Sequence, residues 1–234
     1  MPPMADLDVV VHGSGAVAMA AALALGRRGL QVGLAGGAGR QPPAGAAGDV
    51  RVYALNETSV GLLGTLRVWD ALPADARTEV LDMRIEGDAP GAALEFSAWR
   101  SGVERLAWIV DAAELEAALR AAVRFAPHVQ ALPEGVPAAG APLQVIAEGR
   151  HSAARERLGV RMPVHWYGLL GVAARRVADR PHAGLARQWF RSPDVLALLP
   201  FDRPQPERSY GVVWSVPDAR ADALMAMSDT DFEA

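Results

Sequence analysis

The sequence predicts an α/β fold in which a Rossmann-like βαβ unit is combined with an antiparallel β-sheet. The first observation lies in residues 8–35, where a β-branched run ends at a glycine turn, an Ala/Leu-rich segment follows and a second apolar run comes last. This order is typical of a strand, a turn, a helix and a second strand. The second observation lies in residues 163–217, where apolar and polar residues alternate as in half-buried strands.

Composition limits the chemistry that the chain can perform. All 23 basic residues are arginine and cysteine is absent, which excludes Schiff bases, thiolate nucleophiles, disulfides and cysteine metal sites. No stretch approaches the roughly 18 apolar residues of a membrane-spanning helix. A net charge of −4 without a basic stripe argues against a nucleic-acid partner. We therefore expect a cytoplasmic protein, with peripheral contact to a membrane left open.

The glycine turn at Gly13, Ser14 and Gly15, followed by Ala16, is the predicted cofactor-binding site. Gly13 allows the tight turn, Gly15 lets the backbone approach a phosphate, and Ala18 stands where a third glycine would permit close helix packing. The unpaired N–H groups at the start of the next helix, together with the helix dipole, favour a bound pyrophosphate.

One part of the usual dinucleotide pattern is missing. An acid that binds the ribose hydroxyls is expected about 20 residues after the first glycine, but residues 34–37 are Leu-Ala-Gly-Gly. Either water or another segment binds these hydroxyls, or Arg40 binds a 2′-phosphate as in NADP-binding units. A βαβ unit without any nucleotide is the structural alternative.

The remaining elements follow from local patterns of apolar residues, capping residues and turn residues. In the first half we predict a surface loop at residues 36–48, a helix carrying Val60 to Trp69, a hairpin of residues 83–86 and 94–97, and a helix starting with the capping acids Asp111 and Glu114. In the second half we predict a connection at residues 128–142, a buried strand at 143–147, a short helix ending at Gly159, and strands at 166–172, 185–190, 195–199 and 210–216.

Several short segments, taken in order, resemble the FAD-dependent aromatic hydroxylases of the para-hydroxybenzoate hydroxylase fold. The likeness is strongest to the branch that hydroxylates ubiquinone precursors. The matching segments are Gly13-Ser14-Gly15; Asp49-Val50-Arg51-Val52 with Ala54-Leu55-Asn56, Ser59 and Val68-Trp69; Trp108-Ile109-Val110-Asp111 with Leu115 and Leu119; Ala147 to Arg155; Arg187 to Phe190; Leu198-Leu199-Pro200; and Val213-Trp214-Ser215.

The resemblance implies an FAD-binding domain, residues 1–80 and 104–160, interleaved with an antiparallel substrate domain, residues 81–103 and 161–217. Residues 218–234 would begin a helical segment that is truncated, because a helix-start pattern precedes the last residue by less than one turn. We therefore expect the chain to be the N-terminal portion of a longer protein. Without the family's C-terminal Gly-Asp segment, the chain as given should bind FAD poorly and be inactive.

The resemblance also implies the roles of individual residues. Residues 13–16 would contact the FAD pyrophosphate and Arg51 the adenosine or pyrophosphate portion. Glu148 and Gly149 would form the second nucleotide fingerprint, which is Asp-Gly in the family. The implied reaction is the NAD(P)H- and O2-dependent hydroxylation of a small aromatic ring. The resemblance leaves open whether the ring carries a prenyl chain. It also leaves open whether the protein forms a homo-oligomer or joins a biosynthetic complex. The alternatives are a non-catalytic scaffold and an NADP-binding reductase that uses Arg40.

No residue pattern identifies a catalytic side chain or a metal site. His12 and His151 are more typical of partly exposed turn residues than of a general base or a phosphate ligand. The five histidines form no metal-binding spacing. Trp166, Trp189 and Trp214 are candidates for an aromatic substrate pocket, although alternating strands favour a core position.

Overall fold

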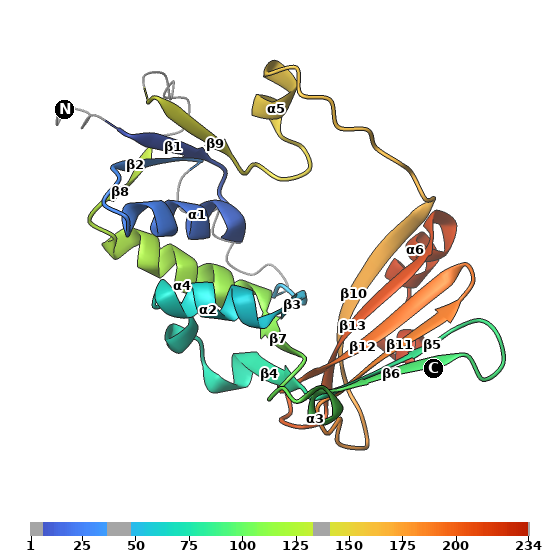
Figure 1. Ribbon diagram of the computed structural model, residues 1–234. Helices are drawn as coiled ribbons and strands as arrows, with labels where there is room; N and C mark the ends of the chain where they lie inside the picture. The colour runs from blue at the N-terminus through green and yellow to red at the C-terminus, as the bar shows by residue number, and fades with distance from the viewer. Residues whose placement is uncertain (1–6, 37–47, 133–140, 234) are drawn as a thin grey trace. The chain divides into compact units, whose positions relative to one another are not determined.

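The computed structural model describes residues 7–36, 48–132 and 141–233 (Figure 1). The chain divides into two compact units. The first is formed by the described parts of residues 1–48, 58–72 and 113–163, and the second by residues 49–57, 73–112 and 164–234. Because each unit is assembled from three separate stretches, the two units are interleaved along the sequence. Residues 49–57, 73–80 and 104–112, which the resemblance assigned to the FAD-binding domain, belong to the second unit.

The first unit is built around a four-stranded parallel sheet with strand order β8-β2-β1-β9. Its first elements are β1 (Val9–His12), α1 (Ala16–Gly26) and β2 (Val32–Ala35), so the predicted βαβ unit is confirmed. Strand β1 pairs with β2 on one side and with β9 on the other. The three valines of β1 are at most 1% exposed, because β1 lies between two other strands of the sheet. Such a buried parallel strand favours a β-branched run.

The two outer strands of this sheet differ from the sequence-based prediction. Residues 129–132, predicted to be part of a connection, form β8 (Val129–Leu132), which pairs in parallel with β2. The strand predicted to be buried, β9 (Leu143–Ile146), lies at the sheet edge, and Leu143 is 51% exposed. Hydrogen bonding to a neighbouring backbone stabilises both short segments, and their own apolar pattern does not reveal that partner.

The helices of the first unit are α2 (Glu57–Thr65), α4 (Ala112–Phe125) and α5 (Ala153–Arg157). Helix α4 lies where it was predicted, with Leu115, Leu119 and Val123 buried. Helix α2 ends before Trp69, which the sequence had placed on it. The chain leaves the helix at Arg67, whose φ of 59° is left-handed, and Trp69–Ala71 form a separate 3-10 turn.

The second unit contains a six-stranded sheet of order β10-β13-β12-β11-β5-β6, in which the pairing is antiparallel except between β11 and β5. The predicted hairpin and the four predicted later strands therefore belong to one sheet. The strands are β5 (Asp82–Glu86), β6 (Ala93–Ser97), β10 (Leu169–Val177), β11 (Leu185–Arg191), β12 (Asp194–Phe201) and β13 (Ser209–Pro217). Strand β10 begins three residues later than predicted, so Trp166 precedes it and is 83% exposed.

A three-stranded antiparallel sheet, which was not predicted, completes the second unit. It consists of β3 (Val52–Leu55), β7 (Ala107–Asp111) and β4 (Arg77–Val80), in the order β3-β7-β4. A core of Val80, Ile109, Ala186 and Phe201 joins it to the larger sheet. The short helical elements of this unit are Ala74–Ala76, α3 (Ala98–Ser101), α6 (Asp218–Met225) and α7 (Asp229–Glu233). Among the described residues, none of the helices has the length and apolar character needed to cross a membrane.

Candidate functional site

The glycine turn after β1 is shaped by contacts that only glycine permits at its first position. Gly13 has a φ of +132°, and a Cβ atom there would lie 2.3 Å from the carbonyl oxygen of Ala147. The Gly13 N–H donates a 2.8 Å hydrogen bond to the carbonyl of Ala35. Ala18 is fully buried, with its Cβ 3.1 Å from the same Cβ position. Ala18 thus permits the close packing that its place in the motif predicts.

The surroundings of Gly15 differ from those of Gly13. It has an extended backbone (φ −84°, ψ 178°) and precedes α1 as the N-cap, without a side-chain hydrogen bond to cap the helix. No atom of the surrounding chain lies within 4 Å of a Cβ built at this position. The first turn of α1 contains no acidic residue, and the N-terminus of a helix generally favours a negatively charged group.

The structure places the second predicted fingerprint directly beside this turn. The Ala147 N–H donates to the carbonyl of His12 (2.8 Å), which extends the β1–β9 pairing to the start of the segment containing Glu148 and Gly149. Residues 13–16, Glu148 and Gly149 are therefore grouped at the C-terminal ends of adjacent parallel strands. In open α/β sheets, ligands bind at this end of the strands.

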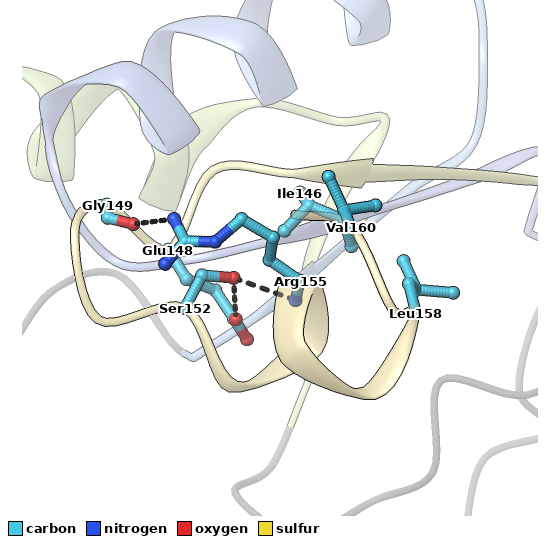
Figure 2. Close-up of a pocket in the computed structure, with 7 residues that line it drawn as sticks. All are labelled: Ile146, Glu148, Gly149, Ser152, Arg155, Leu158 and Val160. Atoms are coloured by element: carbon cyan, nitrogen blue, oxygen red, sulfur yellow. Dashed lines mark hydrogen bonds between the residues drawn. The ribbon is translucent and has the colours of Figure 1, made fainter. Parts of the chain in front are cut away.

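The carboxylate of Glu148 is bound within its own segment, as Figure 2 shows. One of its oxygens accepts hydrogen bonds from the Ser152 hydroxyl (2.7 Å) and the Ala154 N–H (2.9 Å). Ser152 in turn accepts from the N–H of Arg155 (3.1 Å), so both side chains cap α5. The hydrogen bond from Ser152, and then that from Ala154, lowers the pKa of Glu148, and the charge of His12 acts in the same direction.

A hollow of about 260 Å³ lies beside this cap (Figure 2). Arg155 contributes its guanidinium, which donates to the carbonyls of Gly149 (3.4 Å) and Arg150 (2.8 Å). The volume of the hollow lies below the usual range for a drug-sized ligand. Its lining residues are Ile146, Glu148, Gly149, Ser152, Arg155, Leu158 and Val160. Sequence reasoning did not select Ser152 or Arg155 as site residues. The local signal that could have identified Ser152 is a serine directly before a short helical segment, which is typical of an N-cap.

We predict that Glu148→Gln lowers the stability of the protein by about 1 kcal/mol at neutral pH, because a charge-assisted hydrogen bond is replaced by a weaker neutral one. The folded-state pKa of Glu148 lies below its ordinary value of 4.5. The stabilisation is therefore present above pH 4.5 and is lost as the pH falls through the lowered pKa. Urea unfolding at several pH values checks this: the gap between the wild type and the variant should close in acid. Glu156→Gln, on an exposed residue of the same helix, is the control; an equal loss there would contradict the prediction.

Arg51, the remaining predicted site residue, belongs to the second unit. Its guanidinium forms a fork with Asp49, with Nε 2.9 Å from Oδ1 and Nη2 2.6 Å from Oδ2. This hydrogen bonding holds the pKa of Asp49 below its usual value. The Arg51 side chain is still 56% exposed. Arg40, which the NADP alternative requires, lies outside the described residues.

The six-stranded sheet has two different faces. Trp189, Leu196 and Trp214 are in register on one face, where α6 packs and a hollow of about 440 Å³ contains both tryptophans. Both tryptophans line this hollow, and Trp214 also packs against the core cluster of Val172, Val216, Ala221 and Leu224. By strand alternation, Phe190 and Val213 lie on the opposite face. Leu94 and Phe96 lie there too, and these four side chains are between 38% and 62% exposed.

Comparison with known proteins supports the fold. No family model matches the chain. Ubiquinone hydroxylase UbiL of Rhodospirillum rubrum is 27% identical over 244 residues, which cover 97% of this chain and 56% of UbiL. The chain thus spans little more than half the length of this relative.

Solved structures of flavoproteins share the fold at low sequence identity. PqsL of Pseudomonas aeruginosa, a probable FAD-dependent monooxygenase, superposes with a TM-score of 0.68 at 18% identity, over 94% of this chain and 63% of PqsL. HpxO of Klebsiella pneumoniae, in a structure with FAD, gives 0.60 at 18% identity, over 90% of this chain and 57% of HpxO. The predicted α/β architecture is therefore confirmed.

Proposed function

We propose that this chain, which resembles the FAD-dependent aromatic hydroxylases in sequence and in fold, contributes the FAD pyrophosphate site of a monooxygenase that uses NAD(P)H and O2 to hydroxylate an aromatic ring. FAD binding is to be measured on the whole protein. The observation that carries the proposal is Gly15. The chain itself leaves the space at its Cβ empty, at the uncapped N-terminus of α1 and beside the segment of Glu148. A bound pyrophosphate explains why a side chain is absent there.

The residues present fit FAD in most respects. The amides of residues 15–18 would bind the pyrophosphate, Arg51 would bind the adenosine or pyrophosphate portion, and Glu148 with Gly149 would lie beside the ribose. FAD, when bound, supplies the redox chemistry with NAD(P)H and O2. The protein's part is to orient the aromatic ring and to exclude water from the reaction.

The substrate-binding surface that we propose is the face of the six-stranded sheet opposite α6. Its exposed Leu94, Phe96, Phe190 and Val213 suit a small aromatic ring, and an apolar surface also favours a prenyl chain. The name of the relative UbiL supports a ring of the ubiquinone-precursor type for this chain. We place the protein in the cytoplasm. Peripheral contact with a membrane would give it access to an apolar substrate.

One observation favours a second candidate, a non-catalytic hydroxylase-like scaffold. The acid expected after β2 is absent, and a carboxylate oxygen of Glu148 is bound to Ser152 and Ala154. The first feature removes an acceptor for the ribose hydroxyls, and the second occupies one of the two carboxylate oxygens of Glu148. A scaffold of this kind would fold normally and bind no FAD.

We predict that Gly15→Val abolishes FAD binding while the fold is kept. The extended backbone at Gly15 accepts a β-branched residue, but its side chain would fill the space that phosphate oxygens need. We expect the FAD dissociation constant, measured by flavin fluorescence, to rise by about 100-fold or more, as for the loss of several charge-assisted hydrogen bonds. Thermal unfolding of the same variant should change by only a few degrees.

The matched control is Gly61→Val, in the exposed part of α2, where a Cβ also meets nothing within 4 Å. It should leave both FAD affinity and stability near the wild-type values. An unchanged FAD dissociation constant in folded Gly15→Val would disprove this site. A wild-type protein that binds no FAD would favour the scaffold.

A further inference from the structure

The backbone that carries Arg51 is held by a single side chain from a distant strand. Arg175, on β10, donates through Nη2 to the carbonyl of Asp49 (2.9 Å) and through Nε to that of Val50 (3.3 Å). The same Nη2 lies 3.5 Å from the carbonyl of Arg51. One planar guanidinium thus spans three consecutive carbonyls immediately before β3.

The guanidinium of Arg175 is itself fixed in place. Its Nη2 donates to the carboxylate of Asp111 (3.1 Å), whose side chain is only 4% exposed. Its carbon centre lies 5.0 Å from the centroid of the Phe201 ring, within cation–π range. Arg175 is therefore a rigid link between β7, β12 and the segment of residues 49–51.

The contacts of Arg175 are not part of a sheet ladder. Strand β3 pairs with β7 from Val52 onward, and β10 pairs with β13. Residues 49–51 precede these paired residues, and the Ala112 N–H donates to the Arg51 carbonyl (3.2 Å), next to the pair of Val52 with Asp111. Arg175 thus adds hydrogen bonds to the carbonyls of Asp49 and Val50, which precede the paired residues of β3.

We propose that Arg175 is a positioning residue for Arg51, which sets the direction of the Arg51 guanidinium by fixing the backbone of residues 49–51. The inference rests on the proposed function, in which Arg51 binds FAD. The fork between Arg51 and Asp49 sets the side-chain direction relative to the backbone, and Arg175 sets the backbone itself. A lysine in place of Arg175 keeps the charge beside Asp111 but cannot span three carbonyls with one rigid plane.

The test is a double-mutant cycle on FAD affinity. In the wild-type background, Arg175→Gln should raise the FAD dissociation constant about tenfold, and Arg175→Lys should give an intermediate value. In an Arg51→Gln background, Arg175→Gln should add less than about twofold, because there is no guanidinium left to position. A purely structural role would weaken binding equally in both backgrounds, and that result would overturn the proposal.

The matched control is Arg176→Gln. Arg176 is the next residue of β10, points to the other face of the sheet, and places its guanidinium 4.7 Å from the Phe232 ring. The same loss of charge at this position should change FAD affinity by less than about twofold. An effect as large as that of Arg175→Gln would mean that general electrostatics, and not positioning, is responsible.

Amide hydrogen exchange without FAD separates this inference from the proposed function. Arg175→Gln should accelerate exchange at Arg51, whose N–H donates to Asp49 Oδ1 (3.0 Å), and at Ala112, more than at the centre of β10. If the wild type binds no FAD, the proposed function fails. The ordering role of Arg175 is tested separately, and unchanged exchange at the amides of Arg51 and Ala112 would overturn it. If Arg175→Gln does not fold, Arg175→Lys serves for both measurements; wild-type exchange and affinity in that variant would refute the inference.

Discussion

Gly13→Ala should be among the most destabilising single substitutions in the first unit, lowering the free energy of unfolding by about 3–5 kcal/mol. Two effects add. An L-residue at a φ of +132° is strained, and the new Cβ would lie 2.3 Å from the Ala147 carbonyl oxygen. That carbonyl cannot move freely, because the Ala147 N–H is hydrogen-bonded to His12. Relief of the clash therefore disturbs the pairing of β1 with β9.

Chemical denaturation measures this loss, with Gly15→Ala as the matched control. A Cβ at Gly15 meets no atom within 4 Å and the backbone there is extended, so this variant should stay within about 0.5 kcal/mol of the wild type. Equal losses at the two glycines would show that the turn is shaped differently. The contrast also explains why FAD binding is best tested at Gly15, where a change in affinity is not confused with unfolding.

Asp111→Asn should cost about 3–5 kcal/mol, the typical cost of removing one partner of a buried ion pair. The Asp111 carboxylate is buried and lies 3.1 Å from Arg175 and 3.6 Å from Arg203. Both arginine side chains are more than three-quarters buried. Without the negative charge, two guanidinium groups would face each other across a neutral amide in a site with little water.

The loss can be measured by urea or thermal unfolding, with Asp75→Asn as the control. Asp75 binds Arg203 at 2.8 Å, but its side chain is 54% exposed. Water screens that pair, so its removal should cost less than about 1 kcal/mol. If Asp111→Asn were as mild as Asp75→Asn, the two arginines would not depend on Asp111 for their burial.

The sequence alone was sufficient where the signal is local. The βαβ unit was predicted because the valines of β1, the turn at Gly13 and the Ala-rich helix are adjacent in sequence. Helix α4 was predicted from one apolar face, and the β5–β6 hairpin from alternation around a turn. The resemblance to FAD-dependent aromatic hydroxylases was also visible in ordered short motifs. It did not depend on knowing which strands pair.

Only the tertiary structure decided the features that depend on a distant partner. Strands β3, β4 and β8 are too short for their own pattern to distinguish them from loops, and they form because a neighbouring backbone completes their hydrogen bonds. Asp111 looked like a helix cap, but its carboxylate also binds Arg175 on β10 and Arg203, which follows β12. The sequence motif assigns the turn to Gly13 and the approach to phosphate to Gly15, but it does not show which atoms surround each glycine. The fold distinguishes them, because it places the carbonyl of Ala147 against Gly13 and leaves the space at Gly15 open.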